Sequence, residues 1–533
     1  MAVGQTSRTQ VRAYRFATRQ MEWAVTQGDS LLPSDPGQLP RRWTMVSFFL
    51  ALLLLAGFSV YGLIRPAPDW RSSTLIVETG SGTLYLNRDG VLYPALNMTS
   101  ALLAMPDSSG ARPEPKEVSA EDIGDAPRGA LMGIPGAPDQ LPAQDALAGG
   151  QWSVCDQLVP SDSATHASVI TSTVVIGQQS PAPAISGEQA ILATPAGGED
   201  VYLLWDGQRS RIDLTDRVVT EALKLEGEQP RPVSIGLLNA IPEGAPITAP
   251  QIPRDNEATQ TFTLFDDTGR PLPVGAVFRV PRVGGADTFY VVLADGVATI
   301  TPTMADLLQF KHSLTSEVPT VKPEAMAQLS IPTQQFGANG ILPADVPQLV
   351  EASADPLLCA AWDRSTAEAD PKANLWTIGA GPDMPADLPM TSLGGTSAQA
   401  QVSQVSIAPG SGAVVSEWVP GQQPAEVDSQ GQVTQQGQIT KVYLVNDLGV
   451  AYPVASTTEL GRLGFTTPVK IAPKVLLDLL PRGATLDQAA AQVLWDAFPD
   501  QMMSGTTLQE TGGVTQTAPI GEATAPVTVT ATS

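Results

Sequence analysis

The sequence predicts an α+β protein with a short cytoplasmic helix, one transmembrane helix and a pseudo-twofold ectodomain built from repeats. Three observations lead to this fold class. An uncharged run fills Thr44–Ile64, four similar β-hairpin segments follow it, and their spacing groups them into two related halves. We therefore expect four small lobes, each a hairpin with a short helix, around a central β-sheet core.

Residues 1–43 are the expected cytoplasmic segment, and residues 44–64 are the expected transmembrane helix. The run has 21 residues without a charge and would span about 31 Å as a helix, which matches a bilayer core. A buried soluble helix seldom lacks charge over this length, and the apolar part of a cleavable signal peptide is shorter and nearer the start. Arg41 and Arg42 precede the run, so the positive-inside rule places the N-terminus in the cytoplasm.

The cytoplasmic segment contains a predicted basic amphipathic helix. Its arginines recur on one face and are Arg8, Arg12, Arg15 and Arg19. Apolar residues broadly share another face and are Val11, Tyr14, Met21 and Val25. The pattern predicts a helix that lies on anionic lipid, one that docks on a cytoplasmic partner subunit, or both.

Four repeats follow within the predicted ectodomain, residues 66–503. Each starts with a strand that carries a tyrosine, turns at an aspartate and a glycine, and continues through a second strand into a short helix. The repeats lie near 82–136, 198–245, 287–335 and 440–485. Their turn residues are Asp89, Gly90, Asp206, Gly207, Asp295, Gly296, Asp447 and Gly449.

The spacing of these repeats predicts a duplication. Tyr85 precedes Cys155 by 70 residues, and Tyr290 precedes Cys359 by 69. The other two repeats are offset by 241 residues, and the extra length falls on a predicted flexible loop at 420–438. Core segments near 150–180 and 355–382 would supply the central sheet. The Thr-, Ala-, Pro- and Gly-rich tail, 504–533, is expected to be disordered.

The two cysteines, Cys155 and Cys359, are predicted to form a disulfide. Both lie in the expected external part, where an oxidising compartment permits the bond. Each has a tryptophan three residues away, in "QWSVCD" and "LCAAWD". Two unrelated buried thiols are the alternative.

Charge and motif content argue against several functions. Residues 66–533 carry 23 basic and 51 acidic residues, and this net charge of −28 disfavours nucleic-acid binding. None of the eight lysines follows a glycine, so the chain has no P-loop. Only two histidines are present, and Asp266-Asp267 is interpreted as a solvated turn. We expect no catalytic residues, no metal and no cofactor.

Several motifs together resemble the EccB family, the single-pass membrane subunit of type VII (ESX) secretion systems. They include "YRFATRQME" (14–22), "IRPAPDW" (64–70), "GTLYLNRDGVLYPALN" (82–97), "QWSVCD", "YVVLADGV" (290–297), "LCAAWD", "APGSGAVV" (408–415) and "VYLVNDLGVAYPV" (442–454). The likeness runs in order from about residue 11 to 503. The chain departs from the family at Gln20, where relatives tend to have a second basic residue, and in the enlarged loop at 420–438.

The resemblance implies a structural component of the secretion channel in the inner membrane. It implies as partners the motor ATPase EccC, EccD, EccE, a mycosin protease, membrane lipid and further copies of the chain. Some relatives are described as ATPases, so the resemblance also raises ATP hydrolysis, although no catalytic motif supports it. A cell-wall-binding module is a third possibility.

Overall fold

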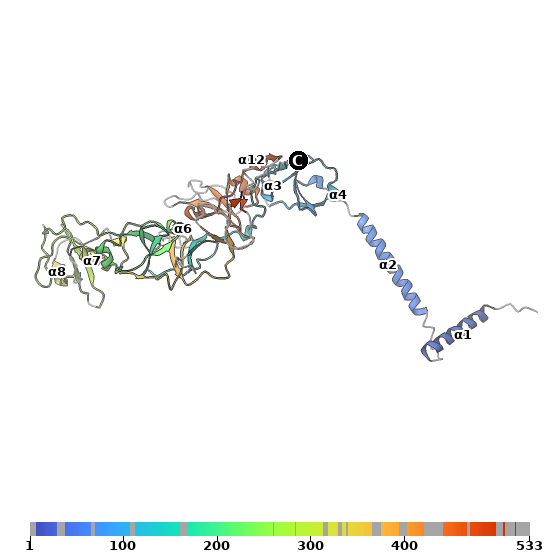
Figure 1. Ribbon diagram of the computed structural model, residues 1–533, viewed down its shortest axis with the longest axis horizontal. Helices are drawn as coiled ribbons and strands as arrows, with labels where there is room; N and C mark the ends of the chain where they lie inside the picture. Colours follow the sequence, from blue (N-terminus) through green and yellow to red (C-terminus); the bar gives the residue numbers. More distant parts are fainter. Residues whose placement is uncertain are drawn as a thin grey trace, which may run out of the picture. The chain divides into compact units, whose positions relative to one another are not determined.

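The computed structural model forms two compact units, Met1–Ser72 and Ser73–Ser533, which we call the N-terminal and C-terminal units (Figure 1). It describes residues 7–28, 38–64, 70–106, 112–159, 169–259, 261–282, 284–312, 318–328, 333–336, 339–364, 375–393, 402–419, 441–465, 469–496, 505–506 and 517–518. The predicted loop at 420–438 lies outside these residues. Of the predicted tail, only the short strands β26 (Gly505–Thr506) and β27 (Thr517–Ala518) are described.

The N-terminal unit contains the two helices that the sequence predicts, α1 (Arg8–Gln27) and α2 (Gln38–Ile64), and the short helix η1 (Trp70–Ser72). Ser7 starts α1 with a capping box to Gln10, and Gly28 ends it at φ 72°. Trp43–Val60 of α2 is long and apolar enough to cross a membrane, and none of it is buried. Because α2 begins at Gln38, Arg41 and Arg42 lie inside this helix and not ahead of it.

The C-terminal unit is rich in sheets, and four of them contain the predicted hairpins. Sheet 1 comprises β1 (Leu75–Thr79), β2 (Leu84–Arg88), β3 (Val91–Pro94) and β4 (Lys116–Ser119). Sheet 2 comprises β8 (Gln189–Pro195), β9 (Val201–Trp205), β10 (Gln208–Ile212) and β11 (Arg231–Val233), with β16 (Gln348–Leu349) also paired to β8.

Sheet 3 comprises β12 (Val277–Val280), β13 (Thr288–Val292), β14 (Val297–Ile300) and β15 (Thr333–Gln335). Sheet 4 comprises β21 (Ala413–Trp418), β22 (Val442–Val445), β23 (Ala451–Val454) and β24 (Lys470–Pro473). In sheets 1, 2 and 4 three antiparallel strands are completed by a fourth strand parallel to the first. Sheet 3 differs, because β15 runs parallel to β14.

A short helix follows the third strand of each of these sheets. These helices are α3 (Met98–Ala104), α5 (Arg217–Ala222), α7 (Pro302–His312) and α10 (Thr457–Arg462). The remaining short helices are α4 (Ala120–Ile123), α6 (Ile235–Ala240), α8 (Pro323–Gln328), α11 (Lys474–Leu477), α12 (Gln488–Ala491), η2 (Gln144–Ala146) and η3 (Asn339–Ile341).

A six-stranded central sheet has the order β18-β17-β6-β7-β20-β19. Its strands are β6 (Gln151–Val159), β7 (Val169–Ile176), β17 (Leu357–Asp363), β18 (Trp376–Gly381), β19 (Met390–Ser392) and β20 (Gln404–Ser406). β6 and β7 come from the predicted core segment near 150–180, and β17 and β18 come from that near 355–382. The same unit contains two-stranded sheets of β5 (Leu131–Met132) with β25 (Leu494–Trp495) and of β26 with β27.

Buried side chains join the sheets in pairs. One cluster contains side chains of sheets 1 and 4, including Leu86 and Leu444. Another contains side chains of sheets 2 and 3, including Leu203 and Val291. A third covers the central sheet with α6 and α11. Sheets 2 and 4 also contribute side chains to this third cluster, so they pack on the central sheet, whereas sheets 1 and 3 pack on sheets 4 and 2.

Candidate functional site

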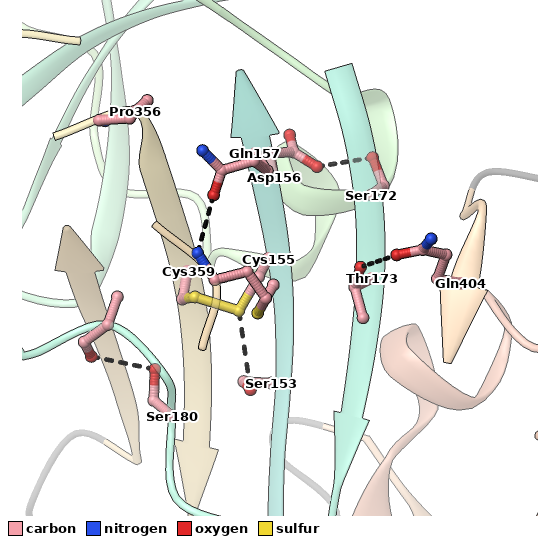
Figure 2. The surroundings of a disulfide bond; sticks show 12 residues. Ser153, Cys155, Asp156, Gln157, Ser172, Thr173, Ser180, Pro356, Cys359 and Gln404 are labelled. Atoms are coloured by element: carbon pink, nitrogen blue, oxygen red, sulfur yellow. Dashed lines mark hydrogen bonds between the residues drawn. A yellow bond between two sulfur atoms is a disulfide. The ribbon is translucent and has the colours of Figure 1, made fainter. Parts of the chain in front are cut away.

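The junction of β6 and β17 is the best-defined candidate site, because two distant parts of the chain meet there in register. Cys155 is paired with Cys359 across the two antiparallel strands, and a disulfide joins them over a sequence separation of 204 (Figure 2). Both cysteines are fully buried, beneath Ala182 and the half-buried Met384. The structure contains the bridge that the sequence predicts.

The opposite face of the same strands carries a row of tryptophans. Trp362 of β17 is the register partner of Trp152 in β6 and of Trp376 in β18. All three are buried, and the ring of Trp418 lies 5.9 Å from that of Trp362. The matching Cys and Trp positions in the two segments thus place a disulfide on one face of the sheet and aromatic packing on the other.

A buried carboxylate ties the central sheet to sheet 2. Asp156 accepts hydrogen bonds from the hydroxyls of Ser172 (2.6 Å) and Ser234 (2.9 Å) and from the Ser234 backbone N–H (2.6 Å). Burial raises the pKa of Asp156, while these hydrogen bonds oppose the rise. Ser234 also caps α6 by accepting a hydrogen bond from the Leu237 N–H.

Arg231 of sheet 2 holds the residues just before β17 by hydrogen bonds. Its guanidinium donates to the carbonyls of Asp355 (2.7 Å) and Pro356. The side chain is buried, and this desolvation lowers the pKa of Arg231 to about 10, against the attraction of Asp156. The region of β17 and α11 has no equivalent of this network. Ala360 follows Cys359, whereas Asp156 follows Cys155, and the N-cap residue of α11, Pro473, makes no side-chain cap.

The recurring tyrosines of the repeats are covered by guanidinium groups in three of the four sheets. Arg128 lies 5.7 Å from the ring centre of Tyr85, and Arg482 lies 4.4 Å from that of Tyr443. In sheet 2 the cation over Tyr202 is Arg209, at 5.5 Å.

Sheets 2 and 3 show how this arrangement varies. In sheet 2 the residue equivalent to Arg128 of sheet 1 and Arg482 of sheet 4 is Glu243. It forms an ion pair of 3.3 Å with Arg209. In sheet 3, Tyr290 instead stacks on Phe278 at 5.3 Å.

A recurring segment supplies Arg128, Glu243 and Arg482, and its pairing was not predicted from the sequence. It reads Pro-x-Gly-Ala-x-apolar and occurs as "PRGALM" (127–132), "PEGAPI" (242–247) and "PRGATL" (481–486). Each copy pairs in parallel with the third strand of its sheet, at Leu92, Arg209 and Ala451. A Cβ on Gly129 or Gly483 would lie 2.3 Å from the ring carbons of Tyr93 or Tyr452.

The predicted turn residues lie in the hairpin connections, with two geometries. Asp89 and Gly90 (φ 54° and 83°) and Asp206 and Gly207 (φ 45° and 69°) form two-residue turns of the expected kind. Asp295 and Gly296 belong to a four-residue connection and have no positive φ. Asp447 and Gly449 lie in a five-residue connection, where Asp447 accepts a hydrogen bond from the Gly410 N–H and only Gly449 has positive φ.

The predicted basic residues belong to the N-terminal unit. Arg8, Arg12, Arg15 and Arg19 are exposed on α1. Phe16 and Tyr14 of the same helix are also exposed, at 58% and 75%. A largely exposed helix with four cations and several large apolar side chains is suited to binding an anionic surface.

The C-terminal unit offers limited material for a cofactor. Among the described residues, no three His, Cys, Asp or Glu side chains are placed to hold a metal ion. His166 lies outside those residues, and His312 contacts Asp255 at 3.2 Å. A pocket of about 240 Å³ lies beside β8, with Glu228 and Glu351 among its lining residues.

Comparison with known proteins decides the family. The family model described as "Type VII secretion system ESX-1, transport TM domain B" matches residues 3–500. The chain belongs to the EccB family of type VII secretion systems. The resemblance that the sequence motifs indicate is therefore confirmed.

Curated EccB relatives match along almost the whole chain. The chain is 30% identical over 504 residues to the ESX-3 secretion system ATPase EccB3 of Mycolicibacterium smegmatis, covering 93% of this chain and 92% of the relative. It is 30% identical over 516 residues to the ESX-5 secretion system ATPase EccB5 of Mycobacterium tuberculosis, covering 94% and 96%.

Chains in solved structures of ESX complexes share the fold. A chain of an intact ESX-5 inner membrane complex is 28% identical, with a TM-score of 0.66 over 96% of this chain and 99% of that one. The EccB3 dimer of an ESX-3 core complex is 29% identical, with a TM-score of 0.63 over 79% and 100%. These structures support a mixed α+β fold with a sheet-rich C-terminal unit.

Proposed function

We propose that the chain is a structural subunit of an ESX inner-membrane complex, in which its C-terminal unit scaffolds the periplasmic assembly. The disulfide-linked strands β6 and β17 of the central sheet are the observation that supports this proposal. A buried disulfide joins two paired strands across a sequence separation of 204, and side chains of sheets 2 and 4 share a core with the central sheet. Such an arrangement ties distant parts of the chain into one compact unit. Solved relatives occupy inner-membrane and periplasmic assemblies of this kind.

The scaffold would contact the motor ATPase EccC, EccD, EccE and a mycosin protease, together with further copies of itself. A relative forms a dimer in the ESX-3 core complex, which supports self-association. Lipid and a cytoplasmic subunit are the proposed contacts of α1, whose exposed arginines suit an anionic surface.

The proposed topology places α1 in the cytoplasm and the C-terminal unit outside. Single cysteines at Thr9 and Asp295, both exposed, provide the test. A membrane-impermeant maleimide applied to intact cells should label Asp295→Cys and should label Thr9→Cys only after permeabilisation. Equal labelling of both positions in intact cells would overturn the topology.

We also propose that the C-terminal unit arose by duplication, with a pseudo-twofold axis between β6 and β17. The order β18-β17-β6-β7 is symmetric about the cysteine pair, and each half contributes one antiparallel hairpin to it. Joint cores of sheets 1 with 4 and of sheets 2 with 3 are the pairing that such an axis would produce.

ATP hydrolysis is the rival function, and the printed names of the relatives are the reason to test it. The purified full-length protein should release no phosphate above the rate of a mock preparation. Hydrolysis that disappears with a single substitution in the C-terminal unit would favour the rival. Pelleting with isolated cell wall would instead favour a wall-binding module.

A further inference from the structure

An interruption in sheet 2 creates the pocket beside β8. One edge of β8 is shared by two short parallel strands placed end to end. β16 pairs with Gln189 and Ala190, whereas β11 begins pairing at Ala193. Ile191 and Leu192 therefore have no register partner on this edge. The pocket of about 240 Å³ opens at the gap, and its lining includes Leu192, Arg231, Leu349, Glu228 and Glu351.

The lining of the pocket carries charge of both signs. Glu228 and Glu351 are exposed at its edge. Arg231 lies deeper and is only 4% exposed, and its Nε has no hydrogen-bond partner among the described residues. The site thus combines two solvated carboxylates with one buried guanidinium, and its net charge is negative.

Size and charge together restrict the ligand. A volume of about 240 Å³ lies below the roughly 300–1,000 Å³ typical of ligand pockets, which favours a small molecule over a nucleotide. A carboxylate on the ligand would be attracted by Arg231, and an ammonium group would be attracted by Glu228 and Glu351.

We propose that this gap in sheet 2 binds a free α-amino acid, with basic amino acids preferred. The zwitterion satisfies both signs of charge in the pocket, and a second ammonium group on a basic side chain matches the excess of carboxylates. The inference goes beyond the scaffolding role and is independent of it, since binding can be measured on the isolated chain.

Calorimetric titration of the full-length protein in detergent tests the proposal with four probes. L-Lysine should bind most tightly and L-alanine more weakly. Acetate and n-butylamine each present one charged group alone and should bind at least tenfold more weakly than L-lysine. Glu351→Gln should weaken lysine binding about tenfold, whereas Glu117→Gln, an exposed acid of sheet 1, should leave it unchanged.

Three results would overturn the inference. Absence of saturable lysine binding would remove the site. Equal affinity for lysine and n-butylamine would show simple attraction of a cation to an acidic protein. An equal loss in Glu117→Gln and Glu351→Gln would place the binding elsewhere. None of these results bears on whether the protein scaffolds a secretion complex.

Discussion

Removal of the disulfide should loosen the central sheet by a measurable amount. The bond closes a loop of 204 residues, and the chain-entropy relation gives about 5 kcal/mol for a loop of this length. Native strain and residual structure in the unfolded chain reduce such values, so we expect the unfolding free energy of Cys155→Ala/Cys359→Ala to fall by about 2–5 kcal/mol.

Urea unfolding followed by tryptophan fluorescence provides the assay, because Trp152 and Trp362 flank the bridge on paired strands. Wild-type protein treated with a reductant should unfold at the same urea concentration as the double variant, and the reductant should not change the variant. A double variant within about 0.5 kcal/mol of the oxidised wild type would refute the proposed role of the bridge.

Three further outcomes are expected. Gly483→Ala should lower the unfolding free energy by about 1–3 kcal/mol, because the added methyl group collides with the Tyr452 ring. Gly461 has open space around it, so Gly461→Ala should not destabilise the protein. Equal effects of the two substitutions would refute the close packing of Gly483 on Tyr452. Asp156→Asn should cost about 1–3 kcal/mol at pH 7, since one acceptor of the network is lost. Burial raises the pKa of Asp156, so the folded state takes up a proton as pH falls toward 4. The wild type should therefore gain stability relative to Asp156→Asn over that range. A difference in unfolding free energy that stays constant with pH would contradict the raised pKa. Replacing the four α1 arginines with glutamine should release α1-containing peptides from anionic vesicles, and unchanged binding would exclude a charge-driven contact.

The features that local chemistry determines were predictable from the sequence. An uncharged run of membrane length predicts α2, and Asp-Gly between apolar strands predicts the hairpins at Asp89 and Asp206. The paired Cys and Trp contexts predict two segments with the same environment, and the structure joins them in the central sheet.

Other features depend on contacts between distant residues and were missed. The Pro-x-Gly-Ala-x-apolar segment varies in its central residue, so its three copies become evident only when their parallel pairing with the third strands is seen. The network of Asp156 joins residues 78 apart, and a single aspartate after Cys155 gives no sign of a buried partner at Ser234. The packing of sheet 1 on sheet 4 likewise depends on long-range contacts that no local pattern encodes.

Cross-linking and affinity purification test the scaffolding role most directly. The full-length tagged chain would be cross-linked in native membranes, purified, and its co-purifying proteins identified by mass spectrometry. The proposed role predicts recovery of EccC, EccD and EccE with further copies of the chain, and no loss of these proteins when nucleotide is removed. Recovery of the chain alone, from membranes in which those subunits are present, would contradict the account.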